Sequence, residues 1–70
     1  QSERIKILNI AISKLPQNQN TAIRLSKFEG LASKEIAEIM DLSNSAVESL
    51  LHRSKTNLRS MLQKYYDGKL

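Results

Sequence analysis

The amino-acid sequence predicts an all-α domain of four helices, without β-strands and without a winged element. Three observations support this fold class. Apolar residues recur at steps of three and four, which is the period of one helical face. Pro16 and Gly30 separate the periodic segments. Residues 35–50, which read EIAEIMDLSNSAVESL, have the pattern of two helices joined by a short turn. Because 70 residues provide one small core, we treat residues 1–70 as a single domain.

The first helix is expected to begin at Ser2 or Glu3 and to end before Pro16. Proline disfavours the helical conformation of the residue that precedes it, whereas it suits the first turn of a new helix. We therefore expect Pro16 to separate two helices with little linker. The apolar face of the first helix is predicted to consist of Ile5, Leu8, Ile12 and Leu15.

A second helix is expected over about residues 17–28. Gly30 follows it and supplies the left-handed backbone conformation that commonly terminates a helix. The side chains of this helix that are predicted to face the core are Ala22, Leu25 and Phe28.

A helix-turn-helix unit is predicted from about Ser33 to Leu62, with its first helix over residues 33–40 and Ser33 as the N-cap. Ala37 provides a small side chain where the two helices cross closely. Asp41 is among the residue types that tolerate the unusual backbone angles of such a turn. The apolar contacts that hold the angle between the helices are expected from Ile36, Met40, Leu42, Val47 and Leu50.

The fourth helix is expected to begin after Ser43 or Asn44, because Ser43 is a favourable N-cap, and to continue to Tyr65 or Tyr66. Its apolar stripe is predicted to consist of Val47, Leu51, Leu58, Leu62 and Tyr65. At about 100° per residue, the opposite face carries Ser45, Glu48, Ser49, His52 and Thr56, with Arg53 and Arg59 at its margins.

The charge of the chain favours a polyanionic partner. Eleven Lys and Arg against seven Asp and Glu give a net charge of +4. Such a charge also keeps a small domain soluble, so its distribution matters more than its size. From Ser43 to Tyr66 the only acid is Glu48, whereas the same segment carries several cations. Because a helix-turn-helix places its second helix in the major groove, we predict a DNA-binding domain.

Several other classes of function are excluded by the composition. The chain has no cysteine, so it holds no disulfide and no thiolate metal site, and it fits a reducing cytosol. His52 is the only histidine, and one histidine without cysteines does not provide enough ligands for a zinc site. No acid is spaced in the sequence to orient His52 as a catalytic base. We therefore expect no cofactor, no metal and no enzyme activity. No apolar run approaches the roughly 20 residues of a membrane span.

The run from Leu15 to Leu62 resembles region 4 of bacterial RNA polymerase sigma factors, and most closely the small extracytoplasmic-function class. The resemblance is carried by an ordered combination of short pieces with suitable gaps. These pieces are Leu15-Pro16, Phe28-Glu29-Gly30-Leu31, Glu35-Ile36-Ala37-Glu38-Ile39-Met40, Val47-Glu48-Ser49-Leu50-Leu51-His52-Arg53 and Leu58-Arg59.

The resemblance implies a cytoplasmic, four-helix domain that binds the upstream (−35) promoter element. It also implies docking on the β flap of the RNA polymerase core, and binding of an anti-sigma factor as a further partner. We expect a monomer. Since the first residue is Gln1, we expect the chain to be part of a longer protein whose preceding domain handles the downstream promoter element.

The predicted DNA-contacting residues follow from this resemblance and from the geometry of the motif. Ser43 matches the cap of the recognition helix, and Ser49 and Arg53 match positions that reach base edges or phosphates. His52 near the groove face and Lys34 at the start of the third helix are candidate phosphate contacts, and for each the alternative is an ordinary exposed side chain without a role in binding. The leading turn closest to the bases is matched by Asn44, Ser45 and Ala46.

Two positions depart from the family pattern, in which Lys or Arg is common at the positions of Glu48 and Leu50. Glu48 either accepts a hydrogen bond from a cytosine amino group or is a solvated acid favoured by the helix dipole. Leu50 is expected in the core, with contact to a thymine methyl as the alternative.

Two other functions remain open from the sequence. The segment from Leu25 to Val47 also resembles the LuxR-type effector domain of a response regulator, although Glu48, Ser49 and Leu50 do not fit that family's Lys-x-His pattern. Alternatively, the departures at Glu48 and Leu50 indicate a helix-turn-helix that binds a protein, such as an anti-sigma factor, instead of DNA.

Overall fold

Four α-helices form the regular structure in the computed structural model, which describes residues 2–68. They are α1 (Glu3–Ser13), α2 (Gln17–Lys27), α3 (Ser33–Met40) and α4 (Asn44–Tyr66). No strand occurs among the described residues. The predicted all-α fold class is therefore confirmed, as are the bounds of α3 and α4.

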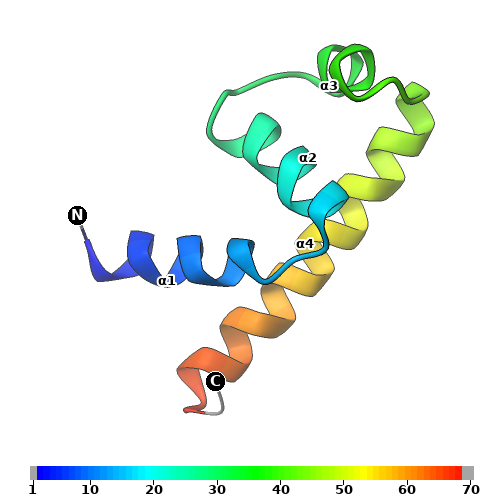
Figure 1. Ribbon diagram of the computed structural model, residues 1–70. Helices are drawn as coiled ribbons and strands as arrows, with labels where there is room; N and C mark the ends of the chain where they lie inside the picture. Colours follow the sequence, from blue (N-terminus) through cyan, green and yellow to red (C-terminus); the bar gives the residue numbers. More distant parts are fainter. Residues whose placement is uncertain (1, 69–70) are drawn as a thin grey trace.

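Helix α4 is the element on which the other three assemble. Figure 1 shows it as one long helix, with α2 along its N-terminal half, α3 across its N-terminal end and α1 meeting it near the middle. Its side chains Val47, Leu50 and Leu51 are buried in the core. The remaining members of this core are Ile12, Leu15, Ala22, Ile23, Ile36 and Ala37.

The face that α1 buries differs from the predicted one. The helix begins as expected, with the Ser2 side-chain oxygen accepting a hydrogen bond from the Ile5 N–H at 3.2 Å. Ile5, however, is 45% exposed, while Ile7 and Ala11 are buried. At about 100° per residue, Ile5 lies roughly a quarter turn from the centre of the buried face. The prediction was right for Ile12 and wrong for Ile5.

Helix α2 ends at Lys27, so Phe28 is its C-cap and not an inward-facing residue. The Phe28 side chain is 50% exposed, and the Arg24 guanidinium carbon lies 5.7 Å from the centre of its ring. Ile23, which we had not predicted, is fully buried instead. Phe28 lies nearly opposite to Ile23 on the helix, which explains the error. Gly30 has the predicted positive φ, 68°.

Helix α3 begins one residue earlier than a cap at Ser33 would require. Ala32 is the N-cap and Ser33 is the first helical residue, so the prediction of Ser33 as the cap was wrong. Alanine has no side-chain acceptor, but the Glu35 carboxylate accepts a hydrogen bond from the Ala32 N–H at 2.9 Å. This half of a capping box satisfies one of the N–H groups that a helix start leaves free.

Polar contacts that the sequence did not indicate join α2 to α4. The Ser54 side chain is fully buried: its hydroxyl donates to the Leu50 carbonyl within α4 at 2.7 Å and lies 3.5 Å from the Gln19 carbonyl of α2. Next to it, the Asn57 amide nitrogen donates to the Gln19 side-chain oxygen at 2.7 Å. Because a buried polar group without a partner is costly, these bonds fix the position of α2 along α4.

The substitutions Ile36→Val and Ile39→Val compare a buried and an exposed residue of α3. Ile36 is fully buried and Ile39 is 60% exposed. Ile36→Val is expected to lower the free energy of unfolding by about 0.5–1.5 kcal/mol, because a buried methylene is lost and a cavity remains. Ile39→Val is the matched control and should change stability by less than about 0.5 kcal/mol. Urea unfolding followed by circular dichroism measures both, and equal effects would contradict the assignment of the core.

Candidate nucleic-acid interface

The turn between α3 and α4 depends on the backbone of Asp41. This residue has φ 57° and ψ 49°, a left-handed conformation, and is the only non-glycine residue with positive φ among residues 2–68. The N–H groups of Asp41 and Leu42 both donate to the carbonyl of Ala37, the latter at 3.0 Å. Ala37 itself is buried. The predicted roles of Asp41 and Ala37 in the turn agree with this geometry.

Leu42 does not take the core position that we predicted for it. Its side chain is 40% exposed, while Ile36, Val47 and Leu50 are buried. The left-handed residue before Leu42 redirects the chain toward the start of α4, and this leaves Leu42 on the outside of the turn.

Ser43 begins the second helix of the motif as predicted. Its side-chain oxygen accepts a hydrogen bond from the Ala46 N–H at 3.1 Å. The N-terminus of α4 is therefore capped, and its first turn contains no acidic residue. In the structure, the Ser43 side chain therefore serves as the N-cap that starts α4.

One face of the N-terminal half of α4 is free, and it is polar. Figure 1 shows this half of α4 with α2 and α3 on one side only. Val47, Leu50, Leu51 and Ser54 are buried on the covered side. The exposed side chains are Asn44, Ser45, Glu48, Ser49, His52 and Arg53.

Four of the predicted contact residues come together around one shallow hollow on this face. Glu48, Ser49, His52 and Arg53 line it. They occupy consecutive turns of a single helix, so their relative positions are fixed by the backbone of α4. We call this surface the α4 hollow.

The other predicted contact residues have different positions. Asn44 and Ser45 are exposed in the first turn of α4, whereas Ala46 is half-buried. Lys34 is exposed but lies on α3 and does not line the α4 hollow. Leu50 is buried in the core, as expected, so it is not available to a thymine methyl.

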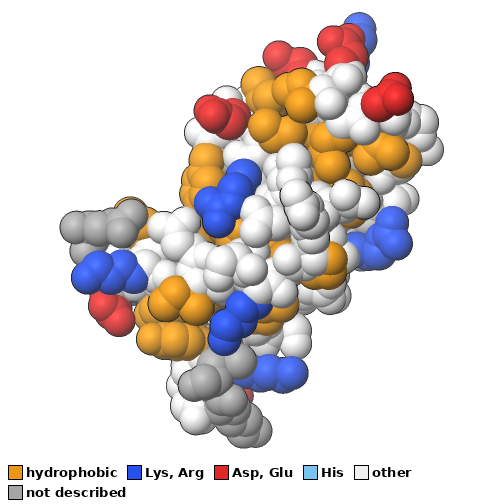
Figure 2. All heavy atoms as spheres, in the orientation of Figure 1, with side chains coloured by type: hydrophobic (Ala, Val, Ile, Leu, Met, Phe, Trp, Pro, Cys, Tyr) orange, Lys and Arg blue, Asp and Glu red, His pale blue; other side chains and the backbone are white. Residues whose placement is uncertain are grey.

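The charges of the domain are separated in space. Figure 2 shows acidic side chains gathered at the end of the molecule that holds α3. Four of the seven acids lie within residues 29–41, whereas α4 carries Arg53, Lys55, Arg59 and Lys64 with a single acid, Glu48, within its bounds. The excess of positive over negative side chains therefore lies along α4, which favours the approach of a polyanion.

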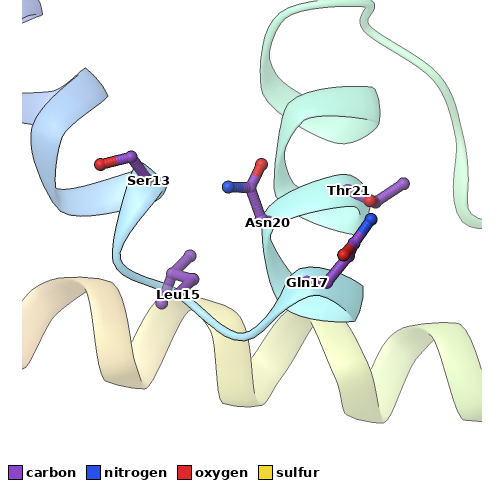
Figure 3. Close-up of a pocket in the computed structure, with 5 residues that line it drawn as sticks. All are labelled: Ser13, Leu15, Gln17, Asn20 and Thr21. Atoms are coloured by element: carbon purple, nitrogen blue, oxygen red, sulfur yellow. The ribbon is translucent and has the colours of Figure 1, made fainter.

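Two further hollows were not predicted from the sequence. One is a polar crevice between α1 and α2, where Figure 3 shows Asn20 extending between the two helices. The Asn20 amide nitrogen donates to the Ile12 carbonyl at 3.0 Å, and this hydrogen bond links α2 to α1. The Asn20 side-chain oxygen accepts from Arg24 at 2.7 Å. The second is an apolar groove with a basic rim, lined by Ile23, Lys27, Lys55, Leu58, Arg59 and Leu62.

The sequence contained a signal for part of this groove. Lys55 and Arg59 are four residues apart on the same helix and flank Leu58 and Leu62, which belong to the predicted apolar stripe. A stripe that continues beyond the residues covered by α2 and α3 indicates an apolar surface with cations beside it. The contribution of Lys27 and Ile23 required knowledge of how α2 packs on α4.

No metal centre or membrane span is found in the described part of the chain. Within residues 2–68, no three His, Cys, Asp or Glu side chains are placed to hold a metal ion. None of the four helices combines the length and apolar character that crossing a membrane requires.

These features define a class of protein. A helix-turn-helix whose second helix presents a polar, exposed face has the geometry of the DNA-binding proteins that insert this helix in the major groove. A comparison with family models identifies the family: the model described as sigma-70, region 4 matches residues 6–58. The chain belongs to the sigma-70 region 4 family, so the predicted resemblance is confirmed.

Two relatives agree with this assignment. The chain is 37% identical over 62 residues to the ECF RNA polymerase sigma-E factor of Haemophilus influenzae, covering 89% of this chain and 33% of that protein. It is 33% identical over 52 residues to the RNA polymerase sigma factor SigZ of Bacillus subtilis, covering 74% of this chain and 30% of that protein. The chain thus spans about a third of the length of these relatives.

Substitution of Asp41 tests the turn that positions α4. Asp41→Ala is expected to lower the free energy of unfolding by about 1 kcal/mol or more, because alanine tolerates a left-handed conformation less well than aspartate. Asp41→Gly is the matched variant and is expected to be close to neutral, since glycine adopts positive φ without steric cost. Thermal unfolding of both variants checks this prediction, and a glycine variant less stable than the alanine variant would refute the role of the backbone conformation.

Proposed function

We propose that this chain is the promoter-reading module of an alternative sigma factor, which recognises the −35 element through α4. The observation that carries the proposal is the free polar face of α4, whose reverse face is held in the core of a sigma-70 region 4 domain. This arrangement presents Asn44, Ser45, Ser49 and Arg53 to the major groove on a rigid helix.

The proposed contacts divide into two kinds. Asn44, Ser45 and Ala46 are in the first turn of α4, which is the part that enters the groove and lies nearest to base edges. Lys34, His52 and Arg53 are assigned to phosphates, which position the protein without reading sequence. Ser43 acts indirectly, through the cap that starts the helix.

The proposed partners besides DNA are the β flap of RNA polymerase and an anti-sigma factor. The apolar groove beside α2, which presents Leu58 and Leu62 with the cations Lys55 and Arg59 on its rim, is a suitable protein-docking surface. We propose a monomer that acts in the cytoplasm with the polymerase and has no enzyme activity of its own.

The family assignment favours this function over the response-regulator alternative, because the match to sigma-70 region 4 covers residues 6–58. The burial of Leu50 also weakens the idea of a helix-turn-helix that binds only proteins. That idea rested on Glu48 and Leu50 at positions where basic residues are expected, and Leu50 faces the core instead.

A module of this size is expected to bind DNA weakly when it is alone. Non-specific affinities of such proteins are on the order of 10⁻⁴ to 10⁻⁶ M at physiological salt. Attachment to the polymerase raises the effective concentration of the module at the promoter, so a weak contact becomes effective in the assembly.

Arg53→Ala tests the proposed interface. The substitution is expected to weaken binding to promoter DNA and to lower the slope of log K against log salt concentration by about 1, since one phosphate contact is lost. Fluorescence anisotropy of labelled duplex DNA over a series of salt concentrations measures both quantities.

Arg4→Ala is the matched control for this experiment. Arg4 is exposed on α1, and its removal changes the net charge by the same amount. We expect a smaller loss of affinity and an unchanged slope. An equal loss for both arginines would show that only net charge matters and would remove the basis for a specific contact at Arg53.

A further inference from the structure

Glu48 is the one acid on a helix face that otherwise suits a polyanion. It is exposed on α4, and together with Ser49, His52 and Arg53 it lines the α4 hollow. A carboxylate at this place repels phosphates and lowers the affinity for DNA in general. Its position therefore requires a compensating interaction, or it is a solvated side chain that contributes nothing to binding.

The interactions within the protein do not account for Glu48. No side chain among the described residues forms a hydrogen bond or an ion pair with its carboxylate. The residues three and four positions later are Leu51 and His52, so no lysine or arginine stands at the spacing that supports ion pairs along a helix. The carboxylate is free to accept hydrogen bonds from outside.

The helix dipole is also a weak explanation for this acid. Helix α4 begins at Asn44, so Glu48 is its fifth residue and lies beyond the first turn. The favourable effect of a negative charge decays within that turn. The positions where it is strongest, in the first turn, contain no acid at all.

The major groove of DNA offers only two kinds of hydrogen-bond donor to a carboxylate. In the major groove these are the N4 amino group of cytosine and the N6 amino group of adenine, whereas guanine and thymine present acceptors there. Beside the adenine N6 group lies N7, an acceptor whose lone pair repels the second carboxylate oxygen. Cytosine has a C–H at the neighbouring position and creates no such repulsion. A carboxylate therefore prefers cytosine.

Arg53 borders the same hollow, five residues after Glu48, so it lies about 7.5 Å further along the helix axis and about 140° around it. The two side chains therefore project from α4 in different directions. The phosphate contact proposed for Arg53 leaves the base edge to Glu48.

We propose that Glu48 is a specificity-determining residue that reads a cytosine in the major groove, within a site that contains a C·G pair. The inference rests on the proposed function, because it assigns a base to the surface that we expect to meet DNA. Glu48 lowers the affinity for DNA of arbitrary sequence, and its hydrogen bond to cytosine offsets this loss at sites with that base. Its contribution is therefore discrimination between DNA sequences.

Selection from random duplex DNA followed by binding measurements tests this proposal. The probe is a library of double-stranded DNA with a randomised segment, selected at low salt by the present chain and by the variants Glu48→Gln and Glu48→Ala. Glu29→Gln is the control, since Glu29 is an exposed acid outside α4 and its substitution changes the net charge equally.

The wild-type chain is expected to select sites with cytosine at one fixed position, and replacement of that C·G pair by any other pair should weaken binding about five- to a hundredfold. Glu48→Gln should shift the preference at this position to adenine, which a carboxamide binds through N6 and N7. Glu48→Ala should abolish the preference there, and both variants should bind unselected DNA more tightly than the wild type. Glu29→Gln should retain the cytosine preference.

Two results would overturn the proposal in different ways. If both Glu48 variants select the same sites as the wild type, Glu48 is a solvated acid, and the proposed promoter-reading function stands without it. If the wild-type chain shows no salt-dependent binding to any duplex, the proposed function itself fails, and the role of Glu48 fails with it.

Discussion

The burial of one face of α4 is the constraint on which the rest of the structure depends. Val47, Leu50 and Leu51 lie in the core beneath α2 and α3, so the helix cannot rotate about its axis without exposing them. Because side-chain direction along a helix is fixed by its period, this burial also determines which residues face outward. The polar face is therefore specified by the apolar one. The contacts of Ser54 and Asn57 with Gln19 add an axial restraint, since they tie the middle of α4 to the start of α2.

Most of the fold could be predicted from the sequence, because helix punctuation is a local property. Pro16, Gly30 and Asp41 act through their own backbone preferences and Ser43 through its side-chain cap, and all four have the expected role. The errors concern Ile5, Phe28, Leu42 and Ser33, whose environments depend on neighbours distant in sequence or on a competing cap. When apolar residues recur every three or four positions, a short helix can have more than one possible buried face. Only the angle at which α1 and α2 meet α4 decides which face is buried, and that angle is not encoded in the spacing.

The candidate site follows the same division. The exposed residues of α4 were predictable, since they are opposite to a strong apolar stripe on a long helix. The grouping of Glu48, Ser49, His52 and Arg53 around one hollow also follows from helix geometry. In contrast, the polar residue in the core, Ser54, and the basic rim that Lys27 shares with α4 depend on packing between helices. The separation of charge depends on both the sequence and the packing. Four acids are close together in the sequence, within residues 29–41, and the fold places this segment at one end of the molecule.

The length of α4 has a mechanical consequence. The helix runs from Asn44 to Tyr66 without a glycine or proline, so it has no hinge. Its first half carries the α4 hollow, and its second half carries Leu58 and Leu62 of the apolar groove. The two surfaces therefore lie one after the other on a single rigid helix about 34 Å long. Under the proposed function, a protein bound at the groove would set the tilt of the turns that face DNA, because a rotation of α4 moves both surfaces together.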